Sequence, residues 1–357
     1  MEERFIYRTH YQVTEPRLFT VLIRSCASPT AAAHPDTVAE CLSRSVGVHG
    51  KRLNVPAARY AVDIARRMEL VAENQHWSWK AHAINLVSTP EATVDAPLTL
   101  EEQLLFLKYY LERDGAILLE ILHRASSGSG IPKRALTETD FIDDIFRHVW
   151  TEYLEVAVNV RQRTELRHRL EDLKRRPLEP KTRKHKTAFH FEALVRLGLL
   201  ELLEDDEPTF VLAQGRGSMP AAELARELSS LQDLDKAAES GSLWQAIGAA
   251  YAGYPGTSPG VLKEFWPAFS DAYARISATD VAIVPIGALI DYAVTKCFVA
   301  GETAVTTVDL MAELERQRSK HPSSMRFHVD RQGRPAFIVM DDSLLDDLGQ
   351  LELAPPA

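Results

Sequence analysis

Cysteine is scarce in this chain: its 357 residues include three, Cys26, Cys41 and Cys297. Disulfide-stapled domains carry more cysteines at closer spacing, so these three exclude that class and fit a reducing compartment. The first residues, MEER, open with acidic side chains instead of a basic stretch followed by an apolar run. We therefore expect no secretion signal and a cytoplasmic location.

Long hydrophobic runs are also lacking. The most apolar stretch, residues 281–300, is interrupted by Pro285, Asp291 and Lys296. A membrane-spanning helix needs about 20 mostly apolar residues, and a charge at mid-membrane costs about 3 kcal/mol or more. We expect this stretch to form a buried helix and the protein to make no membrane contact.

No local motif for catalysis or cofactor binding is recognisable. A phosphate-binding loop needs the spacing GxxxxGK followed by Ser or Thr, which residues 128–133 lack. Several residues are of metal-binding types but lack the spacing of zinc or nuclease sites; they are Cys26, His34, Cys41 and His49, and Asp140, Asp143 and Asp144. We expect a non-enzymatic protein without a metal or cofactor, and a hydrolase site assembled from distant residues is a further alternative.

What is present is the composition of a globular protein. Hydrophobic residues make up 45% of the chain and charged residues 25%, and the length predicts two or three domains. The formal net charge is −9, so any contact with nucleic acid must come from local basic patches. Polar stretches at residues 88–97 and 214–220 read as linkers, which predicts modules at 1–95, 96–214 and 215–357.

The first module has a pattern of three helices followed by a hairpin. Residues 18–25 and 37–46 have helical spacing, and a third helix follows Asn54, with apolar residues at intervals of three and four. Residues 70–72 and 83–87 read as two short strands around an aromatic turn.

The second module repeats this order at its end. Helical spacing covers a pair of segments, 100–112 and 116–123, separated by Asp114 and Gly115, and then a long run at 138–173. A helix at 188–197 ends at Gly198. Strands are then expected at 199–203 and 209–213, around an acidic turn.

The third module contains the clearest strand pair. Helices are expected at 286–295 and 308–320, followed by alternating apolar residues at 325–329 and 337–339. The turn between them, 330–334, contains Gly333 and suits a hairpin. Together the three modules predict a mainly α fold with small β-hairpins.

This serial pattern resembles proteins of the tandem winged-helix type. The segments that carry the likeness are Arg59–Trp79, His185–Ala213 and Val308–Met340, each a helix that runs into a hairpin. The resemblance implies binding of double-stranded DNA through the third helix of a module. Winged helices also serve as protein-protein adaptors in accessory subunits of chromosome-organising ATPases, and serial modules occur in the recognition half of some restriction enzymes.

A basic run lies before and at the start of the expected recognition helix of the second module. Its candidate DNA contacts are Arg175, Arg176, Lys181, Arg183, Lys184, His185, Lys186 and His190. Basic side chains here could neutralise phosphates, or they could pair with acids three or four positions away on a solvated helix, as Arg161 with Glu165. The acidic turn 204–207 would be repelled by a phosphate backbone.

The other two modules offer smaller basic sets. They are Arg59, Arg66 and Arg67 in the first module, and Arg331 and Arg334 in the turn of the third. We expect a non-enzymatic DNA-binding subunit of a bacterial genome-maintenance, restriction or defence complex, in which a partner such as an ATPase or nuclease subunit supplies catalysis. The alternative is a winged-helix adaptor that binds protein partners without touching DNA.

Overall fold

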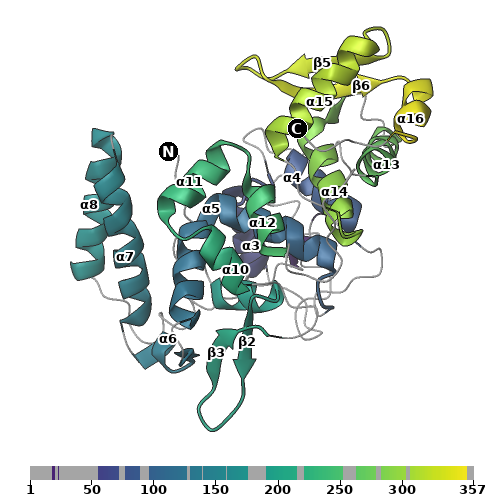
Figure 1. Ribbon diagram of the computed structural model, residues 1–357. Coiled ribbons are helices and arrows are strands. Elements are labelled where there is room, and N and C mark those ends of the chain that lie inside the picture. The colour runs from purple at the N-terminus through teal and green to yellow at the C-terminus, as the bar shows by residue number, and fades with distance from the viewer. Residues whose placement is uncertain are drawn as a thin grey trace. The chain divides into compact units, whose positions relative to one another are not determined.

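The computed structural model is mainly helical (Figure 1), which confirms the predicted mainly α class with small antiparallel β elements. The residues that it describes are 18–20, 23, 55–71, 77–88, 96–126, 129–138, 140–157, 159–175, 190–214, 221–251, 263–278, 283–302 and 306–351.

Contacts divide the described residues into two compact units. Unit 1 runs from Tyr110 to Lys236, and unit 2 comprises the described parts of Arg17–Tyr109 and Ala237–Ala357. The first boundary falls inside helix α5 (Leu100–Ser126), four residues before Asp114, whose backbone angles are not helical. The division into three modules stays a prediction.

Unit 1 contains a three-stranded antiparallel sheet in the order β1-β3-β2. Its elements are the second half of α5, β1 (Ile131–Pro132), α6 (Ala135–Glu138), α7 (Phe141–Val156), α8 (Val160–Arg175), helical residues 190–196, β2 (Leu200–Leu203), β3 (Thr209–Leu212), α10 (Ala221–Glu227) and the start of α11 (Leu231–Glu239). The hairpin β2–β3 confirms the strands expected there. Gly130 has a φ of 69°, and a Cβ at this position would lie 2.7 Å from the carbonyl oxygen of Phe210, so the entry into β1 requires glycine.

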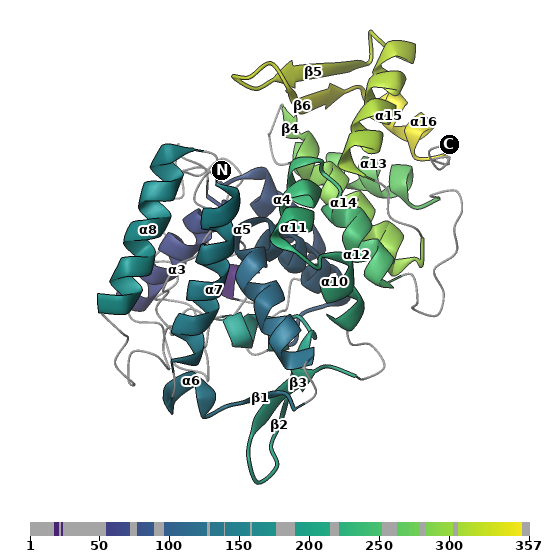
Figure 2. The same cartoon turned by 60° about the vertical axis from the view of Figure 1, so that its left-hand side comes forward.

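The prediction of one continuous helix at 138–173 is wrong. This segment contains two helices, α7 and α8, that lie side by side (Figure 2). Ala157 adopts an extended conformation and ends α7. Leu166 and Leu173 are buried residues of α8, whose principal packing partner is α7. Residues 157–159 contain no glycine or proline. The local signal is Asn159, whose Oδ1 accepts from the Arg161 amide (2.8 Å) and caps the start of α8, and the packing of α8 on α7 accompanies the turn.

Unit 2 contains the other described sheet, with strand order β4-β6-β5. Its elements are α3 (Val55–Arg67), α4 (Trp79–Val87), the first half of α5, α12 (Leu243–Tyr251), α13 (Phe265–Ser277), β4 (Val284–Pro285), α14 (Ile286–Val299), α15 (Thr307–Lys320), β5 (Met325–Val329), β6 (Pro335–Met340) and α16 (Asp342–Leu348). Helix α14 is buried against α13 and α4, as the sequence predicts for its apolar stretch. No helix among the described residues is both long and apolar enough to cross a membrane.

The prediction of a hairpin at the end of the first module, with strands at 70–72 and 83–87, is wrong. Val71 and Trp77 form an isolated β-bridge, and residues 83–87 belong to helix α4. A short apolar run cannot be assigned to a strand or a buried helix from periodicity alone. Packing decides it here: α4 lies against α14, and a Cβ on Gly287 would come within 2.8 Å of the Trp79 ring.

A buried ion pair lies at the centre of unit 2. The Asp291 carboxylate accepts hydrogen bonds from Lys108 Nζ (3.1 Å), Tyr109 Oη (2.9 Å) and Trp244 Nε1 (2.8 Å). The Lys108 ammonium also lies 5.2 Å from the ring centroid of Trp79 and 5.7 Å from that of Trp244. One carboxylate thereby joins α5, α12 and α14.

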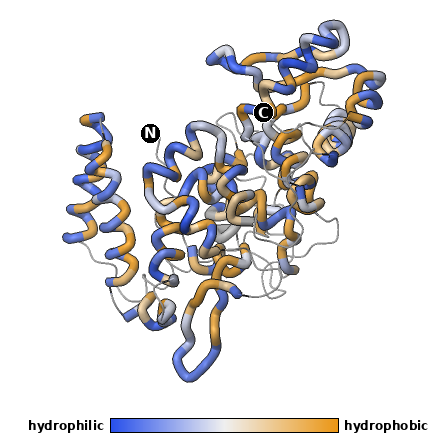
Figure 3. The backbone as a smooth tube through the Cα atoms, in the orientation of Figure 1, coloured by the Kyte–Doolittle hydropathy of each residue, from blue (hydrophilic) through white to orange (hydrophobic). Residues whose placement is uncertain are grey.

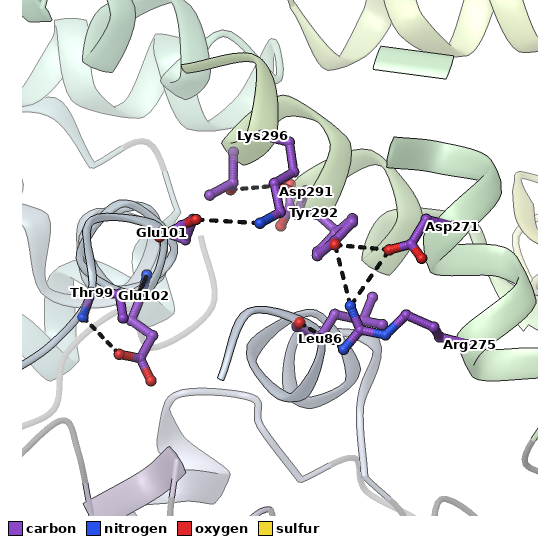
Figure 4. A network of polar contacts seen from close by, with 10 residues as sticks. Leu86, Thr99, Glu101, Glu102, Asp271, Arg275, Asp291, Tyr292 and Lys296 are labelled. Carbon is purple, nitrogen blue, oxygen red and sulfur yellow. Dashed lines mark hydrogen bonds and ion pairs between the residues drawn. The ribbon is translucent and has the colours of Figure 1, made fainter. Parts of the chain in front are cut away.

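More exposed polar contacts surround this pair (Figure 4). Tyr292 Oη donates to Asp271 (2.9 Å) and accepts from Arg275 (3.2 Å), which also donates to the Leu86 carbonyl (2.9 Å). Burial and the Asp271 carboxylate raise the pKa of Tyr292 to about 12, so its hydroxyl keeps its proton. These contacts tie α13 and α14 to the C-terminal end of α4.

His82 of α4 makes the stability of unit 2 sensitive to acid. Burial lowers the pKa of His82 below its ordinary 6.5, so the unfolded chain takes up a proton more readily than the folded one. Stability is then lost as pH falls through about 6.5, and the loss is complete below the folded-state pKa. We expect urea unfolding at about pH 7.5 and about pH 5.5 to show a smaller acid-induced loss for His82→Gln than for the parent chain. Equal losses would contradict this prediction.

Candidate nucleic-acid interface

Residues 265–340 of unit 2, which we call the C-terminal module, present an exposed hairpin. Its elements follow in the order α13, β4, α14, α15, β5 and β6, and β6 lies between β4 and β5. On β5, the exposed Arg326 and His328 alternate with the buried Met325. On β6 the residues that pair with Arg326 and His328, Val339 and Phe337, alternate with the buried Ile338. The hairpin therefore has one core-facing side and one exposed side with basic character.

The turn of this hairpin holds its one acidic residue in place. Asp330 accepts hydrogen bonds from the backbone amides of Gln332 (2.8 Å) and Arg334 (3.0 Å), and from Arg334 Nε (3.2 Å). The Arg334 contact and these amides lower the pKa of Asp330, so the carboxylate stays charged. Arg331 is exposed and makes no ion pair with any described residue. A partner that approaches the tip therefore meets an excess of positive charge.

Helix α15, which precedes this hairpin, offers few groups for base recognition. Thr306 caps its start by accepting from the Asp309 amide (3.0 Å). The outward residues of the first two turns are Val308, 60% exposed, and Ala312. Arginine, lysine, asparagine and glutamine are the side chains that read base edges with two hydrogen bonds, and neither outward position carries one.

The arginines of α15 lie in its second half and are paired. Arg316 forms two hydrogen bonds with Glu313 (2.6 and 2.7 Å), and this contact raises the pKa of Arg316. Arg318 pairs with Glu315 (2.8 Å) and lies over the ring of Phe327, 5.4 Å from its centroid. These pairs reduce the positive charge that the helix presents.

In unit 1 the corresponding hairpin is acidic. The turn between β2 and β3 contains Glu204, Asp205, Asp206 and Glu207, and it forms a hydrophilic tip in Figure 3. Glu207 is paired with Arg134 (2.6 Å), and the other three carboxylates are exposed. A phosphate backbone would be repelled by this tip.

The basic run of unit 1 is described only in part. Arg175 is exposed at the end of α8 and pairs with Glu171 (3.3 Å). The remaining predicted contacts of the run lie outside the described residues; they are Arg176, Lys181, Arg183, Lys184, His185 and Lys186.

His190 does not lie on the surface. Its side chain is buried beside Phe146, and its Nε2 lies 2.6 Å from Oδ2 of the fully buried Asp114. The prediction that His190 approaches bases is therefore wrong. Its imidazole is buried and forms a hydrogen bond with the carboxylate of Asp114, the residue at which α5 departs from helical geometry. The sequence offers no local signal for this pair, because the two residues are 76 positions apart.

The predicted contacts of the first module lie on α3 or just after it. Arg59, Arg66 and Arg67 are exposed, and Arg67 pairs with Asp63 (3.2 Å). The expected aromatic tip does not exist as a hairpin: Trp77 is buried, and Trp79 packs edge-on against Tyr109. Lys80, which follows Trp79, is also buried and donates to Glu69 (2.7 Å).

The described residues include several side chains of types that serve in catalysis or metal binding. No set of three or more His, Cys, Asp or Glu side chains there is arranged to hold a metal ion. Asp143 is buried, and Asp144 is paired with Arg147. The Cys297 thiol is buried, which raises its pKa and keeps it protonated and unreactive. The possible zinc ligands Cys26, His34, Cys41 and His49 lie outside the described residues.

Comparison with known proteins adds no relative: no family model, no curated protein and no solved structure matches this chain.

Proposed function

We propose that this chain is a non-enzymatic DNA-binding subunit whose C-terminal and central modules are winged helices. The winged-helix order is helix, strand, helix, helix, strand, strand, with the first strand paired to the last. The C-terminal module follows it from α13 to β6, and its sheet order β4-β6-β5 agrees. Unit 1 has the same order from α5 to β3, with α7 and α8 inserted, and the sheet order β1-β3-β2.

The observation that carries the proposal is the basic hairpin of the C-terminal module. Arg326, Arg331 and Arg334 are exposed on it, and Asp330 is the single acid of the turn. A hairpin of this charge fits the phosphate backbone or the minor groove of a duplex. The outward positions at the start of α15 are Val308 and Ala312, whose side chains cannot form hydrogen bonds with base edges. The proposed binding is therefore largely independent of base sequence.

A charge-neutral variant of the hairpin tests this function. We expect Arg331→Gln to weaken binding of a fluorescent duplex and to reduce the slope of log affinity against log salt by about one unit, since one phosphate contact is lost. The matched control is Arg226→Gln, which removes another exposed arginine, on α10 of unit 1. Anisotropy titrations at several salt concentrations with two unrelated duplex sequences measure both effects. Absence of duplex binding, or an equal effect of the control, would contradict the proposal.

The acidic tip of unit 1 favours a second function, a protein-protein adaptor. Three exposed carboxylates at this tip would oppose DNA and suit a basic protein surface. The two functions differ in one measurement: an adaptor would show little duplex binding even at low salt, whereas a DNA-binding subunit shows binding that falls steeply as salt rises.

A further inference from the structure

Helix α8 is the most solvated helix of unit 1. Apart from Leu166 and Leu173 its residues are exposed or half-buried, and it packs mainly on α7. The guanidinium of Arg169 lies 5.9 Å from the ring centroid of Trp150 on α7, which fixes one face of α8 against that helix. The other sides of α8 are open to a partner.

Three of the basic side chains of α8 form a stripe along one flank of the helix. The helix carries six basic and three acidic residues; they are Arg161, Arg163, Arg167, Arg169, Lys174 and Arg175, and Glu165, Glu171 and Asp172. At 100° per residue, Arg163, Arg167 and Lys174 fall within about 40° of one another, beside the contact with α7. Glu165 and Asp172 fall on the opposite flank.

The remaining acid does not neutralise this basic stripe. Glu171 lies between Arg167 and Lys174 in the sequence, but it pairs with Arg175 at 3.3 Å. Arg163 donates through Nε to the Ala157 carbonyl at the end of α7 (2.5 Å), which orients its guanidinium. Arg167 and Lys174 are exposed and form no ion pair with a described residue.

We infer that Arg163, Arg167 and Lys174 of α8 form a second binding surface for the sugar-phosphate backbone of a duplex, separate from the C-terminal hairpin. The stripe spans about 16 Å along the helix axis, with intervals of about 6 Å and about 10 Å. Duplex DNA carries one negative charge per about 1.7 Å of its axis, so several phosphates lie within that span. Contacts of this kind position a protein on DNA without reading its sequence.

This inference rests on the proposed function, and its test separates the two. Arg167→Gln/Lys174→Gln removes two charges from the stripe, and Arg161→Gln/Arg226→Gln removes two exposed charges outside it, one from the opposite flank of α8 and one from α10. All four residues are exposed, so both variants are expected to keep the melting temperature of the parent chain. Fluorescence anisotropy with one duplex, at several salt concentrations, gives affinity and salt slope for each.

For the stripe variant we expect the salt slope to fall by about two units, because about 0.9 of a unit is lost per phosphate contact. The matched control is expected to change the slope by less than half as much. Equal slopes for the two variants, in a chain whose binding still responds to Arg331→Gln, would overturn the stripe and leave the proposed function standing. Absence of duplex binding by the parent chain would overturn both.

Discussion

Replacing Asp291 by alanine is expected to destabilise unit 2 by about 3–5 kcal/mol, the largest effect predicted here for a single substitution. The Asp291 side chain is 3% exposed and that of Lys108 is 8% exposed. Removal of the carboxylate takes the buried charge of Asp291 away from the Lys108 ammonium, and Tyr109 and Trp244 lose this acceptor. Urea unfolding followed by tryptophan fluorescence measures the loss.

Two further variants separate charge from packing at this position. Asp291→Asn keeps the shape and one acceptor oxygen but removes the charge, so its loss should be smaller than that of alanine. The double variant Lys108→Met/Asp291→Leu removes both charges together and should recover much of the stability, because well-packed apolar residues often replace a buried ion pair at little cost. A loss below about 1 kcal/mol for Asp291→Ala would show that the pair does not hold unit 2 together.

Replacing His190 by leucine is expected to destabilise unit 1 by about 2–3 kcal/mol, the range for a buried hydrogen bond to a charged group. The imidazole joins helical residues 190–196 to Asp114 on α5. Leucine fills a similar volume, so the loss reports on the hydrogen bond more than on a cavity.

Hydrogen-deuterium exchange can localise this effect. Faster exchange is expected in residues 190–196 and around Asp114, while β5 and β6 of unit 2 serve as the internal reference. His190→Gln, which keeps a donor in place, is the matched control and should lose less stability. Similar losses for leucine and glutamine would indicate that ring packing against Phe146, and not the contact with Asp114, is what the structure needs here.

The C-terminal hairpin was the part of the fold most readable from the sequence. Alternating apolar residues and a turn with Gly333 predicted β5 and β6, and the structure contains both strands. On β5 the pattern is informative because Met325 is buried and Arg326 is exposed, and each residue moves to the other face if the register slips by one. On β6 apolar residues occupy both faces, and Phe337 lies on the exposed face while Ile338 is buried.

Helix α4 and the turn between α7 and α8 were not readable in the same way. Most of the surface of α4 is covered and Asn85 is its one exposed residue, so its short apolar run carries no clear period that separates a helix from a strand. The sequence signal for the turn between α7 and α8 is weak, because residues 157–159 contain no glycine or proline and Asn159 alone marks a helix start there. The burial of Leu166 and Leu173 against α7 is a tertiary contribution that the sequence does not reveal.

By itself the sequence determined the mainly α class, the buried helix α14 and the hairpin β5–β6, because periodicity and turn residues act over a few neighbouring positions. Only the tertiary structure decided that Asp291 meets Lys108 and that His190 meets Asp114, partners separated by 183 and 76 residues. It also decided which basic side chains remain exposed, because residue type gives the charge of a side chain, whereas its burial and partners depend on segments far away in the chain.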